Sequence, residues 1–210
     1  MLRIVVRFIK IFIPKSAHIF LQNSFLGLIW KTATGRQRAL LIKVQHIKAC
    51  QKIYNISTFI ETGTYLGEMV WEVRKNFKKI YSIELDDFLF QTAKKRFAPF
   101  PNIQIIKGDS AKILPQILPN ISEPCLFWLD AHYSGGITQK VEPETPIVQE
   151  LRIIKNHPIK DHIILIDDAN AFTGNHDYPV FEELSRLLKE INPEYSIKIQ
   201  DNIIQVYPKR

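Results

Sequence analysis

Short apolar runs alternate with stretches of helical periodicity from residue 58 to the C-terminus. The runs are rich in β-branched and aromatic side chains, whereas apolar residues in the intervening stretches recur every three or four positions. This alternation is typical of βαβ units, which build a parallel sheet with helices on its faces. The predicted strands are 58–61, 79–84, 103–106, 124–130 and 162–167, and the predicted helices are 66–76, 87–97, 111–118, 145–156 and 180–191.

Two more apolar runs, at residues 195–200 and 202–207, close this pattern. They are joined at Asp201-Asn202, a pair that favours a tight turn, so they predict a hairpin. One strand of that hairpin must run antiparallel to the others. The whole pattern predicts an α/β fold with a Rossmann-like, doubly wound sheet.

The first 56 residues differ from the rest in both pattern and charge. Their apolar residues follow a helical period, which predicts N-terminal helices, one ending near Gly35 and another covering residues 36–54. Lys and Arg recur there without any Asp or Glu and contribute much of the net charge of +7. We expect residues 1–56 to form a helical appendage or lid, and residues 57–210 to form the main domain.

Arg3, Arg7 and Lys10 form a basic stripe along the otherwise apolar residues 1–13. Such a helix either lies on an anionic lipid surface or packs against the domain or a second subunit, and we favour packing. Pro14 interrupts the stretch well short of a membrane span, and the unbroken apolar centre of a signal peptide is missing. Only two cysteines are present, which fits a reducing compartment. We therefore expect a cytoplasmic protein, with peripheral membrane contact or a homodimer as further options.

Acidic residues stand at or just beyond the ends of the five predicted parallel strands. Because the carboxyl ends of such strands line the ligand crevice of an open α/β sheet, these side chains are expected to converge there. Random surface carboxylates do not usually follow successive strands in this way. The residues are Glu61, Glu84, Asp109, Asp130, Asp167 and Asp168.

The first strand leads into Glu61-x-Gly63-x-x-x-Gly67, a glycine-bearing turn before a helix. Glycines let the backbone approach a nucleotide-type ligand, and the N-terminus of the helix faces that ligand. A plain strand–turn–helix has the same pattern, so the motif alone leaves both interpretations open. Glu84 lies at the usual spacing for a carboxylate that binds ribose hydroxyls. Asp109 suits an adenine amine, and capping of the next helix is the alternative.

Together, the glycine turn, Glu84, Gly108-Asp109-Ser110 and Trp128-Leu129-Asp130 resemble the class I S-adenosylmethionine (SAM)-dependent methyltransferases. The resemblance covers residue 58 to the C-terminus and implies a seven-stranded sheet whose last strand is antiparallel. Tyr65 departs from it, because many members have a glycine there. The residues that the resemblance implies around the cofactor are Glu61, Thr62, Gly63, Thr64, Tyr65, Gly67, Glu84, Asp109, Ser110 and Asp130.

A narrower resemblance rests on Leu129-Asp130-Ala131-His132-Tyr133 and Ile166-Asp167-Asp168-Ala169. These segments are similar to the metal-dependent sugar O-methyltransferases of the macrocin type. The resemblance implies that Asp130, Asp167 and Asp168 hold Mg²⁺, a cation that prefers oxygen ligands. The metal would lower the pKa of a bound hydroxyl, which makes Asp130 catalytic as well. A turn or helix cap is the alternative for the Asp-Asp pair.

His132 is the predicted general base, since a neutral imidazole suits that task near pH 7. The alternative is a loop histidine that only lies near the site. The stretch from residue 134 to 144 is predicted to be a lid over the acceptor.

The leading hypothesis is an O-methyltransferase that uses SAM and Mg²⁺ on a hydroxyl of a sugar or sugar-like small molecule, with no nucleic acid as partner. A second hypothesis is a non-catalytic protein of the same fold that docks on a membrane or partner through its basic N-terminal helices. A third is a nicotinamide-dependent oxidoreductase, because the glycine turn and Glu84 also suit a dinucleotide. The Asp167-Asp168 pair disfavours the third.

Overall fold

The computed structural model describes residues 34–131 and 145–209. Three predictions fall outside these residues: the helices before residue 34, the role of His132, and the lid at residues 134–144. The division of the chain at residue 56 also stays a prediction. Among the described residues, no helix has the length and apolar character needed to cross a membrane.

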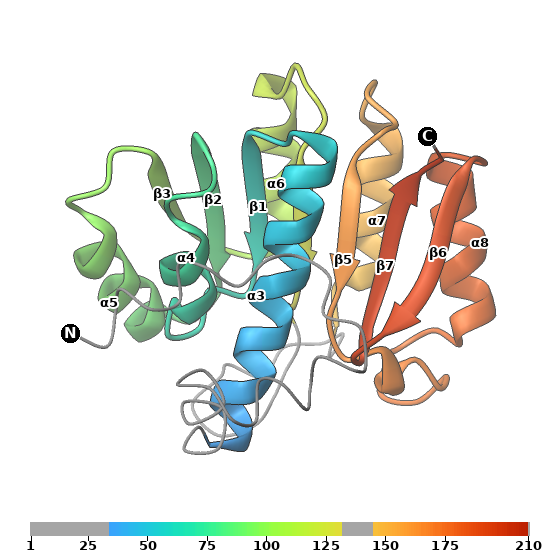
Figure 1. The fold of residues 1–210 in the computed structure, drawn as a ribbon, viewed down its shortest axis with the longest axis horizontal. Helices are drawn as coiled ribbons and strands as arrows, with labels where there is room; N and C mark the ends of the chain where they lie inside the picture. Colours follow the sequence, from blue (N-terminus) through green and yellow to red (C-terminus); the bar gives the residue numbers. More distant parts are fainter. Residues whose placement is uncertain (1–33, 132–144, 210) are drawn as a thin grey trace, which may run out of the picture.

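Seven strands form one sheet with the order β3-β2-β1-β4-β5-β7-β6 (Figure 1). β7 runs antiparallel to its neighbours β5 and β6, and β1 to β5 pair in parallel. The predicted fold, with its last strand antiparallel, is thus confirmed. The strands are β1 (Thr58–Thr62), β2 (Lys79–Glu84), β3 (Ile103–Lys107), β4 (Leu126–Leu129), β5 (Ile163–Ile166), β6 (Tyr195–Gln200) and β7 (Ile203–Pro208).

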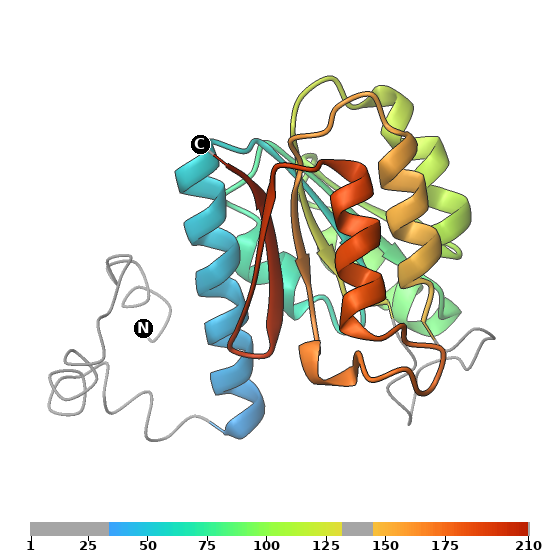
Figure 2. The ribbon, with the colours of Figure 1, turned by 90° about the vertical axis from the view of Figure 1, so that its right-hand side faces the viewer.

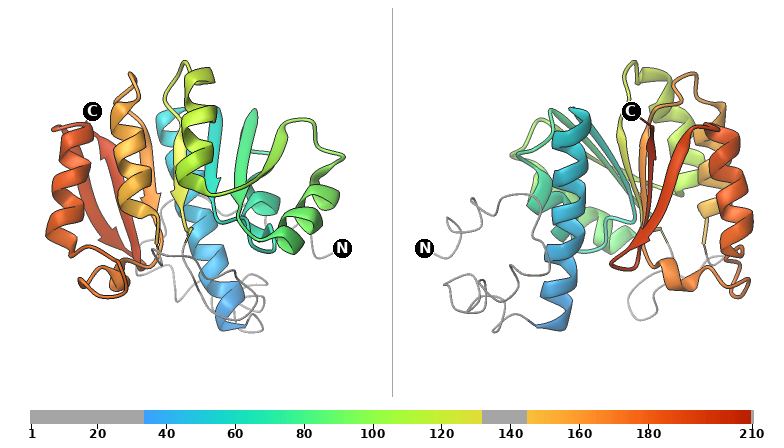
Figure 3. Two further views of the ribbon diagram at one scale, coloured as in Figure 1. Left: turned by 180° about the vertical axis from the view of Figure 1, so that it is seen from behind. Right: turned by 45° about the vertical axis from the view of Figure 1, so that its right-hand side comes forward.

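Helices cover both faces of the sheet, with α3, α4 and α5 on one face and α6, α7 and α8 on the other (Figures 2 and 3). Two short 3₁₀ turns, η2 (Leu118–Asn120) and η3 (Ala169–Ala171), follow α6 and β5. The helices are α3 (Gly35–Tyr54), α4 (Glu68–Val73), α5 (Asp87–Phe97), α6 (Ser110–Ile117), α7 (Ile147–Asn156) and α8 (Phe181–Ile191).

Two hydrophobic clusters, one on each face, hold the helices to the sheet. Successive strand residues point to opposite faces, so in β1 Phe59 packs under α3 to α5 while Ile60 packs under α6 to α8. β4 does the same with Trp128 and Leu129, and its four residues are all buried. A strand that is buried on both faces has to be apolar throughout, which explains the unbroken run seen in the sequence.

Helix α3 begins at Gly35, which corrects the prediction that Gly35 ends a helix. Thr34 makes a capping box with Gln37, so the chain enters the helix there. Asn55 ends α3 in the left-handed conformation. His46 then ties α3 to the closing hairpin, because its ring lies 2.7 Å from Asp201 Oδ2. This anchoring sets the position of α3 over the carboxyl ends of β4 and β5.

Candidate functional site

Asp130 lies at the centre of the carboxyl edge of the sheet. Its N–H donates to the Thr62 carbonyl oxygen at 3.1 Å, which joins the ends of β1 and β4. The Asp167 N–H donates to the Leu129 carbonyl oxygen, also at 3.1 Å, which joins the ends of β4 and β5. The charge of Asp130 contributes to the raised pKa values of Glu61, Glu150 and Asp167. The predicted convergence of strand-end carboxylates is therefore present in the structure.

The turn after β1 needs glycine at two positions. Gly63 has φ of +87°, and a Cβ atom there would stand 2.5 Å from the Asp130 carbonyl oxygen. Gly67 has φ of +68°, and a Cβ atom there would stand 2.7 Å from the Phe97 ring. Tyr65 between them also has a positive φ, +50°, which is the conformation that glycine adopts most readily. Tyr65 therefore adopts the left-handed backbone conformation that a glycine, which many members of the resembling family have there, would adopt.

Glu84 braces this turn from the neighbouring strand. Its Oε2 accepts from the Tyr65 N–H at 2.7 Å and its Oε1 from the Asp86 N–H at 2.8 Å. Burial raises the pKa of Glu84, and these backbone N–H groups oppose that rise. Each carboxylate oxygen keeps a second lone pair, so Glu84 can still accept hydrogen bonds from ribose hydroxyls.

Glu61 is buried beneath the turn, with only 1% of its surface exposed. It accepts a hydrogen bond from the Ser82 hydroxyl, which lies 2.6 Å from the Thr64 hydroxyl. Burial, with smaller contributions from Asp130 and Glu84, raises the pKa of Glu61 well above its usual value. Glu61 thus ties β1, β2 and the turn together, and its position below the turn is a support for the backbone rather than an open binding surface.

Asp109 caps helix α6, as the alternative interpretation proposed. Its Oδ1 accepts from the Ala111 N–H at 3.0 Å, and Lys112 Nζ lies 3.5 Å from its Oδ2. The Ser110 hydroxyl is buried and has no hydrogen-bond partner among the described residues. A role for Asp109 and Ser110 at an adenine stays a prediction, because capping uses only part of the capacity of one carboxylate.

The three predicted metal ligands do lie at one edge of the sheet, but a lysine lies among them. Lys43, from α3, makes an ion pair with Asp167 Oδ2. Asp168 has a left-handed backbone, and its Oδ1 accepts from Asn202 Nδ2 at 3.1 Å. Within the described parts of the chain, no three or more His, Cys, Asp or Glu side chains group closely enough to hold a metal ion. In this arrangement the carboxylates do not fit Mg²⁺, because they do not gather at one point and Asp167 is already paired with an ammonium group.

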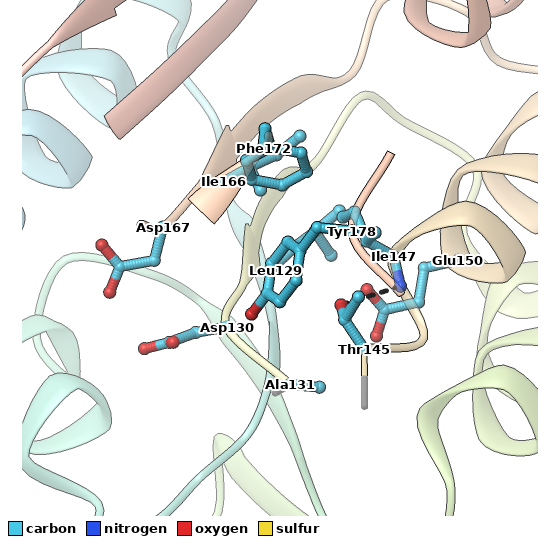
Figure 4. Close-up of a pocket in the computed structure, with 10 residues that line it drawn as sticks. All are labelled: Leu129, Asp130, Ala131, Thr145, Ile147, Glu150, Ile166, Asp167, Phe172 and Tyr178. Carbon is cyan, nitrogen blue, oxygen red and sulfur yellow. Dashed lines mark hydrogen bonds between the residues drawn. The ribbon is translucent and has the colours of Figure 1, made fainter. Parts of the chain in front are cut away.

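A hollow lies beside Asp130 and Asp167, between the ends of β4 and β5 and the start of α7 (Figure 4). Phe172 and Tyr178 line it as an edge-to-face pair with ring centroids 5.2 Å apart. Glu150 lies on the other side of the hollow, next to Thr145, and only 1% of its surface is exposed. Burial raises the pKa of Glu150 to about 7, with Asp109 and Asp130 adding to the rise.

Lys43 and Glu150 were missed by the sequence analysis. Both carry a signal, because each is a charged residue within an apolar helical stripe. Lys43 is three residues after Leu40 and four before Ile47, and Glu150 is four before Ile154. A charge on the buried side of a helix indicates a partner or a site, but the sequence does not say which.

Comparison with known proteins supports the same fold. No family model matches the chain. Ribosomal RNA small subunit methyltransferase A of Dehalococcoides mccartyi is 25% identical over 193 residues, which cover 81% of this chain and 66% of that protein. The SAH-bound methyltransferase PaMTH1 of Podospora anserina superposes with a TM-score of 0.56 at 14% identity, over 97% of this chain and 99% of that chain.

A second solved structure is the O-methyltransferase TomG of Streptomyces achromogenes in complex with SAM. It superposes with a TM-score of 0.51 at 11% identity, over 94% of this chain and 89% of that chain. The chain has the class I methyltransferase fold. In this methyltransferase fold the glycine turn, Glu84 and Asp130 occupy the carboxyl edge of the parallel strands, where such sheets bind their ligands.

Proposed function

We propose that the protein is a SAM-dependent methyltransferase. The observation that carries this proposal is the meeting of the glycine turn, Glu84 and Asp130 at one edge of the sheet. Gly63 is in contact with the Asp130 backbone, and the Tyr65 N–H is held by Glu84, so the two halves of the edge form one unit. The fold is shared with solved methyltransferases that carry SAM or SAH, which supports the same ligand here.

The residues present fit the parts of SAM. The backbone of the turn would lie along the methionine portion, where Gly63 removes a side chain from the approach. Glu84 would accept from the ribose hydroxyls, and Asp109 from the exocyclic amine of adenine. When bound, SAM supplies an electrophilic methyl group on a sulfonium. Asp130, at the centre of the edge, would then face the acceptor and hold it in line with that group.

The hollow between Asp130 and Glu150 is about the size of one water molecule, so it would take only the reacting group of the acceptor. Asp167 Oδ1, a buried carboxylate oxygen at its wall, has no hydrogen-bond partner among the described residues. Glu150 is influenced by the nearby Ser110 and Thr62 hydroxyls, but within the described parts its Oε1 has no partner at hydrogen-bond geometry. A buried carboxylate oxygen without a hydrogen-bond donor is costly, so these oxygens favour a substrate that brings O–H or N–H groups. A hydroxyl of a sugar or a sugar-like small molecule meets this requirement. The proposal includes no metal step, because Lys43 already pairs with Asp167.

An RNA base is the second candidate acceptor. It is favoured by the similarity to a ribosomal RNA methyltransferase along most of this chain, and an exocyclic amine would also satisfy the buried carboxylates. However, the chain spans only about two thirds of the length of that relative. An RNA acceptor would be at odds with the sequence-based prediction that the protein has no nucleic-acid partner. Docking through the basic N-terminal residues, to a membrane or as a homodimer, stays a prediction, because residues 1–33 lie outside the described parts.

Isothermal titration with SAH tests the proposed function. We expect saturable binding with a stoichiometry of one, and no heat at protein concentrations well above micromolar would refute the proposal. A titration with NADH on the same sample would separate the nicotinamide alternative. Methyl transfer from radiolabelled SAM to a panel of sugars, and separately to ribosomal RNA, would then distinguish the two acceptor classes.

A further inference from the structure

Lys43 places a positive charge among the aspartate side chains of the site. Its side chain crosses from α3 to the end of β5, where Nζ pairs with Asp167 Oδ2. The Asp167 side chain is only 2% exposed and that of Lys43 is 26% exposed, so water screens this pair poorly. The two residues are 124 positions apart in sequence, so the ion pair depends on the tertiary fold.

The position of Lys43 is set by the helix that carries it. The next residue, Val44, and Ile47 one turn later are buried against the sheet. Gln205 Nε2 and His46 Nδ1 lie 3.0 Å apart, which links α3 to β7 on the other side of the lysine. The Lys43 ammonium also lies 5.9 Å from the centre of the Trp128 ring on β4. These contacts bring the amine to the carboxylates without requiring movement of the helix.

The other two carboxylates add to the electrostatic environment of Lys43. Asp167, Asp130 and Asp168 all interact electrostatically with the Lys43 ammonium. Asp168 is in addition held by Asn202, on the turn of the closing hairpin. The arrangement thus already contains one cation, paired with Asp167 and near the other two residues that the resemblance assigns to magnesium.

We propose that the Lys43 ammonium is the resident cation of the Asp130–Asp167–Asp168 group and keeps divalent metal ions out of it. A divalent ion at these carboxylates would lie beside a fixed positive charge and would have to break the Lys43–Asp167 pair. This inference rests on the proposed function only for its consequence, which is that methyl transfer at this site needs no divalent metal. The exclusion of metal is a binding property, and it is tested without any acceptor.

Mn²⁺ is a suitable probe, because it prefers the same oxygen ligands as Mg²⁺ and its free form is measured directly by electron paramagnetic resonance. The proteins to compare are the full-length wild type, Lys43→Met, and the double variant Lys43→Met/Asp167→Asn. The matched control is Lys48→Met, five residues along the same helix, where the facing charges are Glu72 and Arg74. Thermal unfolding of each protein checks that it is folded.

We expect the wild type and Lys48→Met to bind Mn²⁺ no tighter than millimolar. Lys43→Met should bind it at least about tenfold more tightly, since removal of one nearby positive charge is worth that much even at a partly solvated site. The double variant should lose the gain. Micromolar binding by the wild type would overturn the proposal by itself, even if Lys43→Met failed to fold.

Two further outcomes would also overturn the proposal. If folded Lys43→Met bound Mn²⁺ no better than the wild type, the lysine would not be what excludes the ion. If the gain survived in the double variant, the new site would lie elsewhere. Titration of SAH into the same samples tests the proposed function separately from the exclusion of metal. If the wild type did not bind SAH, the methyltransferase function would be refuted, whereas the Mn²⁺ result would still stand.

Discussion

Glu150 allows a quantitative test of how the candidate site affects stability. Burial, together with Asp109 and Asp130, raises its pKa from 4.5 to about 7, while Ser110 and Thr62 oppose that rise. A raised pKa means that the folded protein holds the proton more tightly than the unfolded chain. The contribution of the protonated Glu150 side chain to the free energy of unfolding is therefore complete below pH 4.5, and it is lost as the pH rises through 7. One pKa unit is worth about 1.4 kcal/mol, so the full difference corresponds to about 3 kcal/mol.

The substitution Glu150→Gln keeps the size of the side chain and removes its titration. We expect it to have little effect on the free energy of unfolding at pH 4, and to raise that free energy by up to about 3 kcal/mol at pH 8. For a chain of this length the gain corresponds to an increase in Tm of about 6 to 12 °C. Urea unfolding at the two pH values, followed by circular dichroism, measures the difference directly.

A matched control is Glu183→Gln on the exposed side of α8. It should change the free energy of unfolding by less than about 0.5 kcal/mol at either pH, as is usual for a surface substitution. If Glu150→Gln shifted stability equally at pH 4 and pH 8, or lowered it at pH 8, Glu150 would not be a buried carboxylate that resists ionisation. The wall of the hollow would then not contain a buried carboxylate that stays protonated near pH 7.

Other predictions concern the turn and the core. Gly63→Ala would push a Cβ atom against the Asp130 carbonyl oxygen, so SAH affinity should fall by at least about tenfold in titration, whereas Gly35→Ala, with nothing within 4 Å of the added atom, should bind SAH as the wild type does. Tyr65→Gly should relieve the cost of a positive φ and raise the free energy of unfolding by about 1 kcal/mol in a urea melt; a loss of stability would show that the ring contributes more than the backbone strain. Burial, with His157 and Lys160 adding to the effect, lowers the His162 pKa to about 3, so the unfolded chain takes up this proton first. In the Glu150→Gln background, which removes the opposing gain from Glu150 over the same pH range, stability should therefore drop by about 3 kcal/mol between pH 7 and pH 4. His162→Gln should flatten that drop, and an unchanged pH profile in the variant would exclude this histidine as its cause.

Much of the fold follows from local pattern. The predicted bounds of β2, α5 and β6 coincide with those observed, and the other strands and helices predicted within the described residues differ by one or a few residues at their ends. The hairpin turn at Asp201-Asn202 is also present, with positive φ at both residues. Such features are predictable because alternation, helical period and turn chemistry depend on neighbours along the chain. Gly35 begins a helix instead of ending one, because Thr34 before it forms a capping box with Gln37.

Sequence alone thus determined which segments become strands and helices, and which acidic residues end up at the carboxyl edge, because the side of a strand and the end of a parallel sheet follow from chain order. Only the tertiary structure decided what these carboxylates meet there. Lys43 reaches Asp167 across 124 positions, and Glu150 enters the wall of the hollow beside Asp130. A helical stripe shows that a charge faces inward, but its partner depends on how the helix is set on the sheet, and that position results from packing between distant segments.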